Sequence, residues 1–307
     1  MGTMYVAANN SVHRGYFVGD VCTMVKAAWM FAENTPCDNY LLSLLRDDPW
    51  NYLWDGWVRA QRATVVWDEN WPKGNRDHQY SQWDKRRAER NVHGHPFDVW
   101  RELAPRLETA PRHRIFHGKE NGLGRRNIFE YYYFGQPDCP EPVRGSTWFG
   151  PGLFDLPNWY AMDFRDRKPK VFLAPHEKCQ GNRVFTHAFW EQVALRLLDK
   201  EVEVVCNDNG SPFMAGCSHP LFQKTYPPAN KMAETTVGCS LVLCGNTGTG
   251  WIAGATGTPL VAAECGMNLG EYSFEKCGLV SLRATVREPN PEHVAGVVLG
   301  VLGQIHG

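Results

Sequence analysis

The sequence predicts an α/β protein built of two Rossmann-like domains that face each other across a cleft. Short apolar runs rich in valine and leucine recur along the chain, bounded by turn residues and separated by helical stretches such as 187–198. That alternation is typical of buried parallel strands joined by helices. A stretch between 137 and 169 is rich in proline and glycine and has no period, as a linker would. We therefore expect one α/β domain at residues 1–155 and a second at 156–307.

Strands are expected where the apolar runs lie, and a first helix is expected to begin near Asp20. In the N-terminal domain the runs fall at 4–8, 39–45, 63–67 and 114–117. In the C-terminal domain they fall at 170–174, 202–206, 240–244, 259–263 and 278–282. Ligands of such sheets bind at the carboxyl ends of the strands. The loops that follow these runs are therefore where we expect the chemistry.

The composition and the pattern of apolar residues exclude several classes of protein. The 307 residues hold 32 Lys plus Arg against 33 Asp plus Glu, a formal net charge of −1, so no whole-chain field attracts a polyanion. The longest apolar runs are far shorter than the roughly 18 residues of a membrane span, and the N-terminus lacks the apolar core of a signal peptide, which predicts a soluble, cytoplasmic protein. Ten scattered cysteines without a CxxC pair indicate neither a disulfide scaffold nor a zinc site.

One stretch is locally basic. Residues 76–126 carry 12 basic and 7 acidic side chains and five histidines, at 78, 93, 95, 113 and 117. This is the candidate surface for an anionic acceptor, and a solvated helical face is the alternative. Two aromatic clusters, at 131–134 and at tryptophans 50, 54, 57, 67 and 71, fit either stacking platforms or ordinary packing.

The first candidate site follows the first strand. Arg14, Gly15 and Gly19 precede Asp20, and the two glycines allow a sharp turn or a close approach to a ligand. A carboxylate at the start of a helix is favoured by the free N–H groups there, so Asp20 fits a helix cap. The functional alternative is a general base at the carboxyl edge of the sheet.

A second candidate site follows the run at 240–244. The turn Asn246, Thr247, Gly248, Thr249 and Gly250 leads into a helix of small residues. Glycines and hydroxyls at a helix N-terminus suit phosphate oxygens, although the spacing is neither a Walker A loop nor GxGxxG.

Charged residues after two other strands complete the candidate donor site. His176, Lys178 and Arg183 follow the run at 170–174, and the two cations would add charge to a diphosphate held by the glycine turn. Glu264 follows the run at 259–263 and could reach a ribose or sugar hydroxyl. Each also fits an ordinary surface residue.

These motifs together resemble the lipopolysaccharide heptosyltransferase family. The resemblance rests on the Gly-x-x-x-Gly-Asp turn ending at Asp20, on Ala-Pro-His at 174–176 followed by Phe-Trp-Glu-Gln-Val at 189–193, and on Asn-Thr-Gly-Thr-Gly-Trp at 246–251. It covers most of residues 4–45 and 170–265. Members of that family are nucleotide-sugar glycosyltransferases of the two-domain GT-B fold, and the resemblance implies the same fold here.

The resemblance also implies roles for individual residues. Asp20 is similar to the family's proposed base, which would invert the anomeric carbon. Lys178 or Arg183 would stand where the family keeps a phosphate-binding lysine, and 246–248 would match its Asp-Ser/Thr-Gly turn. The family usually has Asp at the place of Asn246 and His at the place of Trp251, which leaves the donor sugar and nucleotide open.

The sequence thus predicts a metal-independent, inverting glycosyltransferase that needs no cofactor beyond its donor, a nucleotide-diphosphate sugar. Its acceptor would be a phosphorylated glycan or another polyanion. Alternatives are transfer to hydroxymethylated bases in DNA, a nucleotide-sugar epimerase, and a non-catalytic nucleotide-binding module.

Overall fold

The computed structural model describes residues 3–7, 18–34, 37–45, 48–68, 112–115, 151–175, 185–208, 210–245, 247–263, 283–286 and 289–307. The chain divides into two compact units, Met1–Ser146 and Thr147–Gly307. The boundary between them falls in the segment rich in proline and glycine. Each unit is described by itself below.

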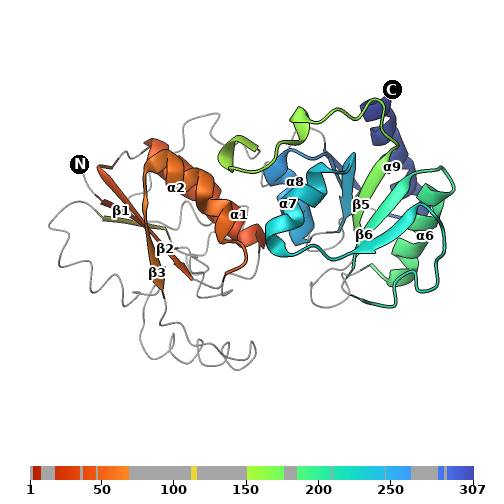
Figure 1. Ribbon diagram of the computed structural model, residues 1–307, viewed down its shortest axis with the longest axis horizontal. Coiled ribbons are helices and arrows are strands. Elements are labelled where there is room, and N and C mark those ends of the chain that lie inside the picture. The colour runs from red at the N-terminus through yellow and green to blue at the C-terminus, as the bar shows by residue number, and fades with distance from the viewer. Residues whose placement is uncertain are drawn as a thin grey trace. The chain divides into compact units, whose positions relative to one another are not determined.

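The first unit is built on a parallel sheet of order β3-β2-β1-β4 (Figure 1). Its elements are β1 (Thr3–Ala7), α1 (Val18–Asn34), β2 (Asn39–Leu45), the 3₁₀ turn η1 (Asn51–Trp54), α2 (Asp55–Gln61), β3 (Thr64–Asp68) and β4 (Arg112–Ile115). Strand β1 pairs in parallel with both β2 and β4. The chain therefore runs outward from β1 to β2 and β3, and then returns to the other side of β1.

Helix α1 supplies much of the apolar core described in this unit. Its side chains Val21, Cys22, Met24 and Val25 are fully or almost fully buried. The rings of Trp54 and Trp57 are buried as well and meet edge to face, with centroids 5.8 Å apart. Ordinary packing therefore explains two of the five tryptophans of the aromatic cluster, since a buried indole removes a large apolar area from water.

The second unit holds a six-stranded sheet of order β10-β9-β8-β5-β6-β7, with every neighbouring pair parallel. After η2 (Pro151–Leu153) and η3 (Trp159–Ala161), its elements are β5 (Lys170–Ala174), α6 (His187–Leu198), β6 (Glu203–Asn207), β7 (Phe222–Thr225), α7 (Ala229–Val237), β8 (Leu241–Cys244), α8 (Gly248–Thr256), β9 (Leu260–Ala263), β10 (Arg283–Val286) and α9 (Pro291–His306).

Helices cover both faces of this sheet (Figure 1). One face presents Val171, Leu173 and Leu243 to a core shared with Trp190 of α6 and Val294 of α9. Helices α7 and α8 pack against each other on the other face. Strands β8 and β9 are buried at every position because both of their faces are covered, and this is why they read as unbroken apolar runs in the sequence.

Most of the expected strands are found within one or two residues of their predicted bounds, and helix α6 begins and ends as predicted. Strand β7 was missed, because its sequence Phe-Gln-Lys-Thr is an exposed edge without an apolar run. The last expected strand, at 278–282, lies outside the described residues. Strand β10 is found just after it. Among the described helices, none is long and apolar enough to cross a membrane.

Candidate functional site

The order of strands in the second unit defines where a ligand crevice should lie. The chain passes from β5 to β6 and β7 on one side, and then crosses to β8, β9 and β10 on the other. The side of the sheet to which successive strands are added therefore changes between β5 and β8. In open parallel sheets the ligand binds at such a switch point, outside the carboxyl ends of the strands. The Gly-rich turn predicted to bind phosphate follows β8 directly and therefore lies at this point.

The N-terminus of α8 is arranged to accept an anion. Thr247 is its N-cap residue, with φ −123° and ψ 165°, and its side chain makes no capping hydrogen bond. The first N–H groups of a helix have no acceptor within the helix. Here the N–H of Gly250 is bonded to the carbonyl of Thr247, while Gly248 and Thr249 form the first two helical positions. Their N–H groups and the positive end of the helix dipole favour a phosphate.

A side-chain hydrogen bond joins this helix to β6. The Nδ2 atom of Asn207, at the carboxyl end of β6, donates to Oγ1 of Thr249 at 3.2 Å. Strand β5 lies between β6 and β8, so the bond spans the carboxyl end of β5. Two buried atoms beside it have no hydrogen-bond partner: Oδ1 of Asn207 and Oγ1 of Thr247. Buried polar atoms without a hydrogen-bond partner are uncommon, because each one lowers the stability of the folded protein by about 1–3 kcal/mol.

Asp208, the next residue, is held in a structural ion pair. Its fully buried carboxylate lies 2.7 Å from Nζ of Lys224 on β7, and it accepts a hydrogen bond of 2.9 Å from the N–H of Ser211. Lys224 also donates to the carbonyl of Ser211. Burial, and next the Asp208 charge, raise the pKa of the neighbouring Cys206 thiol to about 12, so this thiol is not a nucleophile at neutral pH.

In the first unit, Asp20 lies in the first turn of α1, which begins at Val18 and follows β1. Strand β1 is flanked by β2 and β4, so this helix also starts at a switch point. The position is the one expected for a base at the carboxyl edge of the sheet. Gly19 lies in the same turn, and its carbonyl accepts a hydrogen bond of 2.9 Å from Oγ1 of Thr23.

A second carboxyl group follows β2 at the same edge of this sheet. The Oδ1 atom of Asp48 accepts a hydrogen bond of 2.9 Å from the N–H of Trp50. Burial raises the pKa of Asp48 to about 7, against the opposing effect of that hydrogen bond. The sequence analysis did not single out this residue, because nothing in its neighbours marks it as buried.

The structure brings only some of the predicted residues together. Thr247, Gly248, Thr249 and Gly250 form the start of α8, as expected. The remaining predicted donor-side and acceptor-side residues lie outside the described part of the chain, and they are Arg14, Gly15, His176, Lys178, Arg183, Asn246 and Glu264. The basic stretch 76–126 also lies outside it, except for 112–115. Asn207 was missed, although its position at the carboxyl end of an apolar run was a usable signal.

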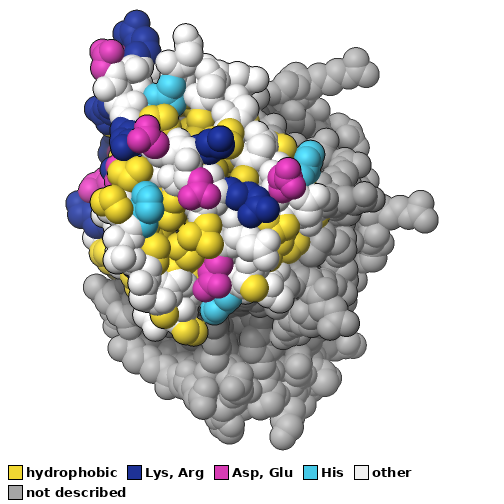
Figure 2. Space-filling model, turned by 90° about the vertical axis from the view of Figure 1, so that its right-hand side faces the viewer, with side chains coloured by type: hydrophobic (Ala, Val, Ile, Leu, Met, Phe, Trp, Pro, Cys, Tyr) yellow, Lys and Arg dark blue, Asp and Glu magenta, His cyan; other side chains and the backbone are white. Residues whose placement is uncertain are grey.

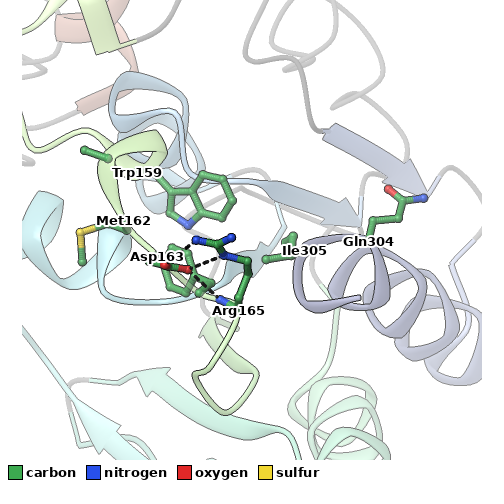
Figure 3. Close-up of a pocket in the computed structure, with 8 residues that line it drawn as sticks. Trp159, Met162, Asp163, Arg165, Gln304 and Ile305 are labelled. Atoms are coloured by element: carbon green, nitrogen blue, oxygen red, sulfur yellow. Dashed lines mark hydrogen bonds and ion pairs between the residues drawn. The ribbon is translucent and has the colours of Figure 1, made fainter.

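A surface pocket of about 410 Å³ lies elsewhere in the second unit (Figure 3). It is lined by Trp159, by residues 161–165 and by Gln304 and Ile305 near the end of α9. The indole N–H of Trp159 donates to the carbonyl of Cys239, two residues before β8 begins. Figure 3 shows the exposed ion pair of Asp163 and Arg165 among the residues that line it. The pocket therefore lies near the amino ends of the strands, away from the predicted ligand edge.

Among the described residues on one face of the second unit, charge is not concentrated. In Figure 2, acidic, basic and apolar side chains are interspersed over the described part of this face. The described part of this face therefore offers no basic surface for a polyanion.

Known structures share this fold over nearly the whole chain. The heptosyltransferase WaaC of E. coli, with ADP, is 13% identical with a TM-score of 0.58, and the match covers 99% of both chains. A glycosyl transferase family 9 protein of Veillonella parvula is 11% identical with a TM-score of 0.60, over 99% of this chain and 97% of that one. The ADP-heptose lipopolysaccharide heptosyltransferase II of E. coli is 12% identical, with a TM-score of 0.56 and 99% coverage of both.

These likenesses confirm the predicted fold, an α/β protein with parallel sheets like those of the heptosyltransferases. No protein-family model matches the sequence, and no curated protein matches it in sequence.

Proposed function

We propose that this protein is a glycosyltransferase that moves a sugar from a nucleotide-diphosphate sugar to an acceptor hydroxyl. The observation that carries the proposal is the uncapped N-terminus of α8 at the switch point of the second unit, with the unpaired hydroxyl of Thr247 beside it. The shared fold supports it, since WaaC is described with ADP and a second solved structure is an ADP-heptose heptosyltransferase.

The chemistry of leaving-group stabilisation follows from the start of α8. When the bond between the anomeric carbon and the diphosphate oxygen breaks, negative charge builds up on the diphosphate. In this scheme the N–H groups of Gly248 and Thr249, which are fixed at the start of the helix, stabilise that charge without rearranging during the reaction. Lys178 or Arg183 is proposed to add positive charge. With these groups in place no metal ion is needed, so we propose metal-independent transfer.

The acceptor is activated by Asp20 in this scheme. Its carboxylate takes the proton of the acceptor hydroxyl as the oxygen bonds to the anomeric carbon, and the nucleoside diphosphate leaves from the opposite side. A single displacement of this kind inverts the configuration. A positioned base of this type contributes about 100- to 10,000-fold to the rate.

The proposed acceptor is a phosphorylated glycan. The support is the local excess of basic residues at 76–126, 12 against 7 acidic, in the half of the chain that also carries Asp20. Phosphate groups on a glycan would pair with arginine forks at such a surface. None of the structural likenesses favours transfer to DNA, an epimerase or a non-catalytic module over this reading.

A thermal-shift screen tests the proposal. UDP, ADP, GDP and CMP, with their common sugar conjugates, are each added at saturating concentration, with and without EDTA. A ligand at 100 times its dissociation constant stabilises the fold by about 2.7 kcal/mol. We expect one diphosphate series to raise the melting temperature equally well with EDTA present. A flat response to every nucleotide contradicts the proposal, and a shift that EDTA abolishes contradicts metal independence.

A further inference from the structure

Asn207 is oriented by its neighbour and still lacks one hydrogen bond. Its Nδ2 donates to Oγ1 of Thr249 at 3.2 Å, and this fixes the amide plane over the carboxyl end of β5. The other end of the amide, Oδ1, is buried and has no partner. A carbonyl oxygen can only accept a hydrogen bond. A ligand group that pairs with Oδ1 is therefore a donor, such as a hydroxyl.

The position of Asn207 indicates which hydroxyl that is. Strand β6 is the second strand of the second unit's sheet. In dinucleotide-binding folds of this strand order, an acidic residue some 20 residues beyond the turn after the first strand binds the ribose hydroxyls. In this unit the first strand is β5, and Asn207 ends the next strand, β6. The carboxylate that follows Asn207 in the chain is that of Asp208, which is paired with Lys224 and accepts from the N–H of Ser211. The Oδ1 atom of Asn207 is an acceptor without a partner, and the hydroxyl of Thr247 near the start of α8 is a second one.

We propose that Asn207 is a specificity-determining residue whose Oδ1 accepts a hydrogen bond from a ribose hydroxyl of the nucleotide donor. Thr249 is a positioning residue that holds the amide in this orientation. The diphosphate would lie at Gly248 and the nucleoside would extend toward β6. This inference rests on the proposed function. It assigns to a neutral amide the contact with the ribose that an acidic residue makes in dinucleotide-binding folds.

Calorimetric titration of the purified protein tests the assignment. The nucleoside diphosphate that binds the wild type is compared with its 2′-deoxy and 3′-deoxy forms and with inorganic pyrophosphate. One hydrogen bond is worth about fivefold in affinity. We expect the wild type to prefer the ribonucleotide over one deoxy form by about that factor. In Asn207→Ala the preference should vanish, while the affinity for pyrophosphate stays the same.

Three further variants distinguish loss of the ribose contact from a general change in folding. Thr249→Val keeps the shape of the side chain but removes the hydroxyl, so it should reduce the ribose preference, whereas Thr249→Ser should keep it. Asn230→Ala changes an exposed asparagine of α7 and should match the wild type in every titration.

The outcomes separate this inference from the proposed function. If the wild type binds a nucleoside diphosphate but Asn207→Ala keeps the ribose preference, or loses pyrophosphate affinity to the same extent, the assignment of Asn207 is wrong and the proposed function stands. If the wild type binds neither nucleotides nor pyrophosphate, the proposed function is wrong and the assignment is wrong with it.

Discussion

The Nζ atom of Lys224 lies 2.7 Å from Oδ2 of Asp208, and it joins the edge strand β7 to the carboxyl end of β6. The aspartate side chain is fully buried, whereas the lysine side chain is 30% exposed. Asp208 also accepts from the N–H of Ser211, so the pair fixes the chain just beyond Asn207. A structural contact of this kind explains why a carboxylate beside the crevice is not itself available to a ligand.

Replacing Lys224 should destabilise the second unit. Lys224→Met leaves the Asp208 carboxylate buried without its counter-ion, and losing one partner of a buried pair costs about 3 kcal/mol. The matched control is Lys231→Met, which breaks an exposed pair with Glu234 and should cost less than about 1 kcal/mol. Urea unfolding followed by circular dichroism measures both. Equal midpoints for the two variants would show that the Asp208 pair contributes nothing.

Asp48 should make the first unit less stable as the pH rises. Its pKa is raised to about 7 from an ordinary 3.8, so the unfolded chain ionises at a lower pH than the folded one. Below about pH 4 both forms are protonated and the group has no effect. Between pH 4 and 7 stability is lost progressively, by at most about 4 kcal/mol.

Asp48→Asn removes this loss and keeps the oxygen that accepts from Trp50. The variant should therefore melt at a higher temperature than the wild type at pH 8 and at the same temperature at pH 4. Asp38→Asn, at an exposed aspartate of the same unit, is the control. A difference between Asp48→Asn and the wild type that is identical at both pH values would exclude the predicted titration.

Replacing an exposed glycine of α9 by alanine should raise the stability of the protein. An added Cβ at Gly300 meets nothing within 4 Å, and the residue lies in the interior of a 16-residue helix. Alanine there restricts the unfolded chain and should stabilise the protein by about 0.5–1 kcal/mol. Chemical denaturation of Gly300→Ala tests this. The comparison variant is Gly210→Ala, where φ is +95°, and it should be destabilised instead.

Asp20→Asn should abolish turnover without loss of donor binding. Consumption of the nucleotide sugar in the presence of a phosphorylated glycan should fall at least about 100-fold, since an amide cannot take the acceptor proton. Glu33→Gln, at an exposed carboxylate near the end of the same helix, should be fully active. Turnover within a few-fold of the wild type in Asp20→Asn would remove this residue from the mechanism.

Much of the fold could be predicted because strands buried on both faces leave a plain signal. Strands β8 and β9 are unbroken apolar runs, and β5 is apolar and buried at every position after Lys170. Strand β7 could not be found in this way, because Gln223 and Lys224 face solvent. Its position depends on pairing with β6, a contact between segments that no local pattern records.

The candidate site was predictable in part for a similar reason. Glycines and hydroxyl side chains between β8 and α8 indicate the N-terminus of a helix, and α8 begins at Gly248. Asn207 was missed because its importance comes from Thr249, 42 residues later in the chain, and from a buried oxygen without a partner. Neither can be read from sequence spacing.

The central claim is that the start of α8 binds the diphosphate of a nucleotide sugar. Calorimetric titration of wild type, Gly248→Asp and the control Gly296→Asp with a nucleoside diphosphate tests it most directly. An aspartate in the first turn suits the helix itself, but its charge would repel a phosphate at close range. We predict an affinity at least about 100-fold lower for Gly248→Asp and unchanged for Gly296→Asp. Equal affinity in all three proteins, or no binding by the wild type, would contradict the account.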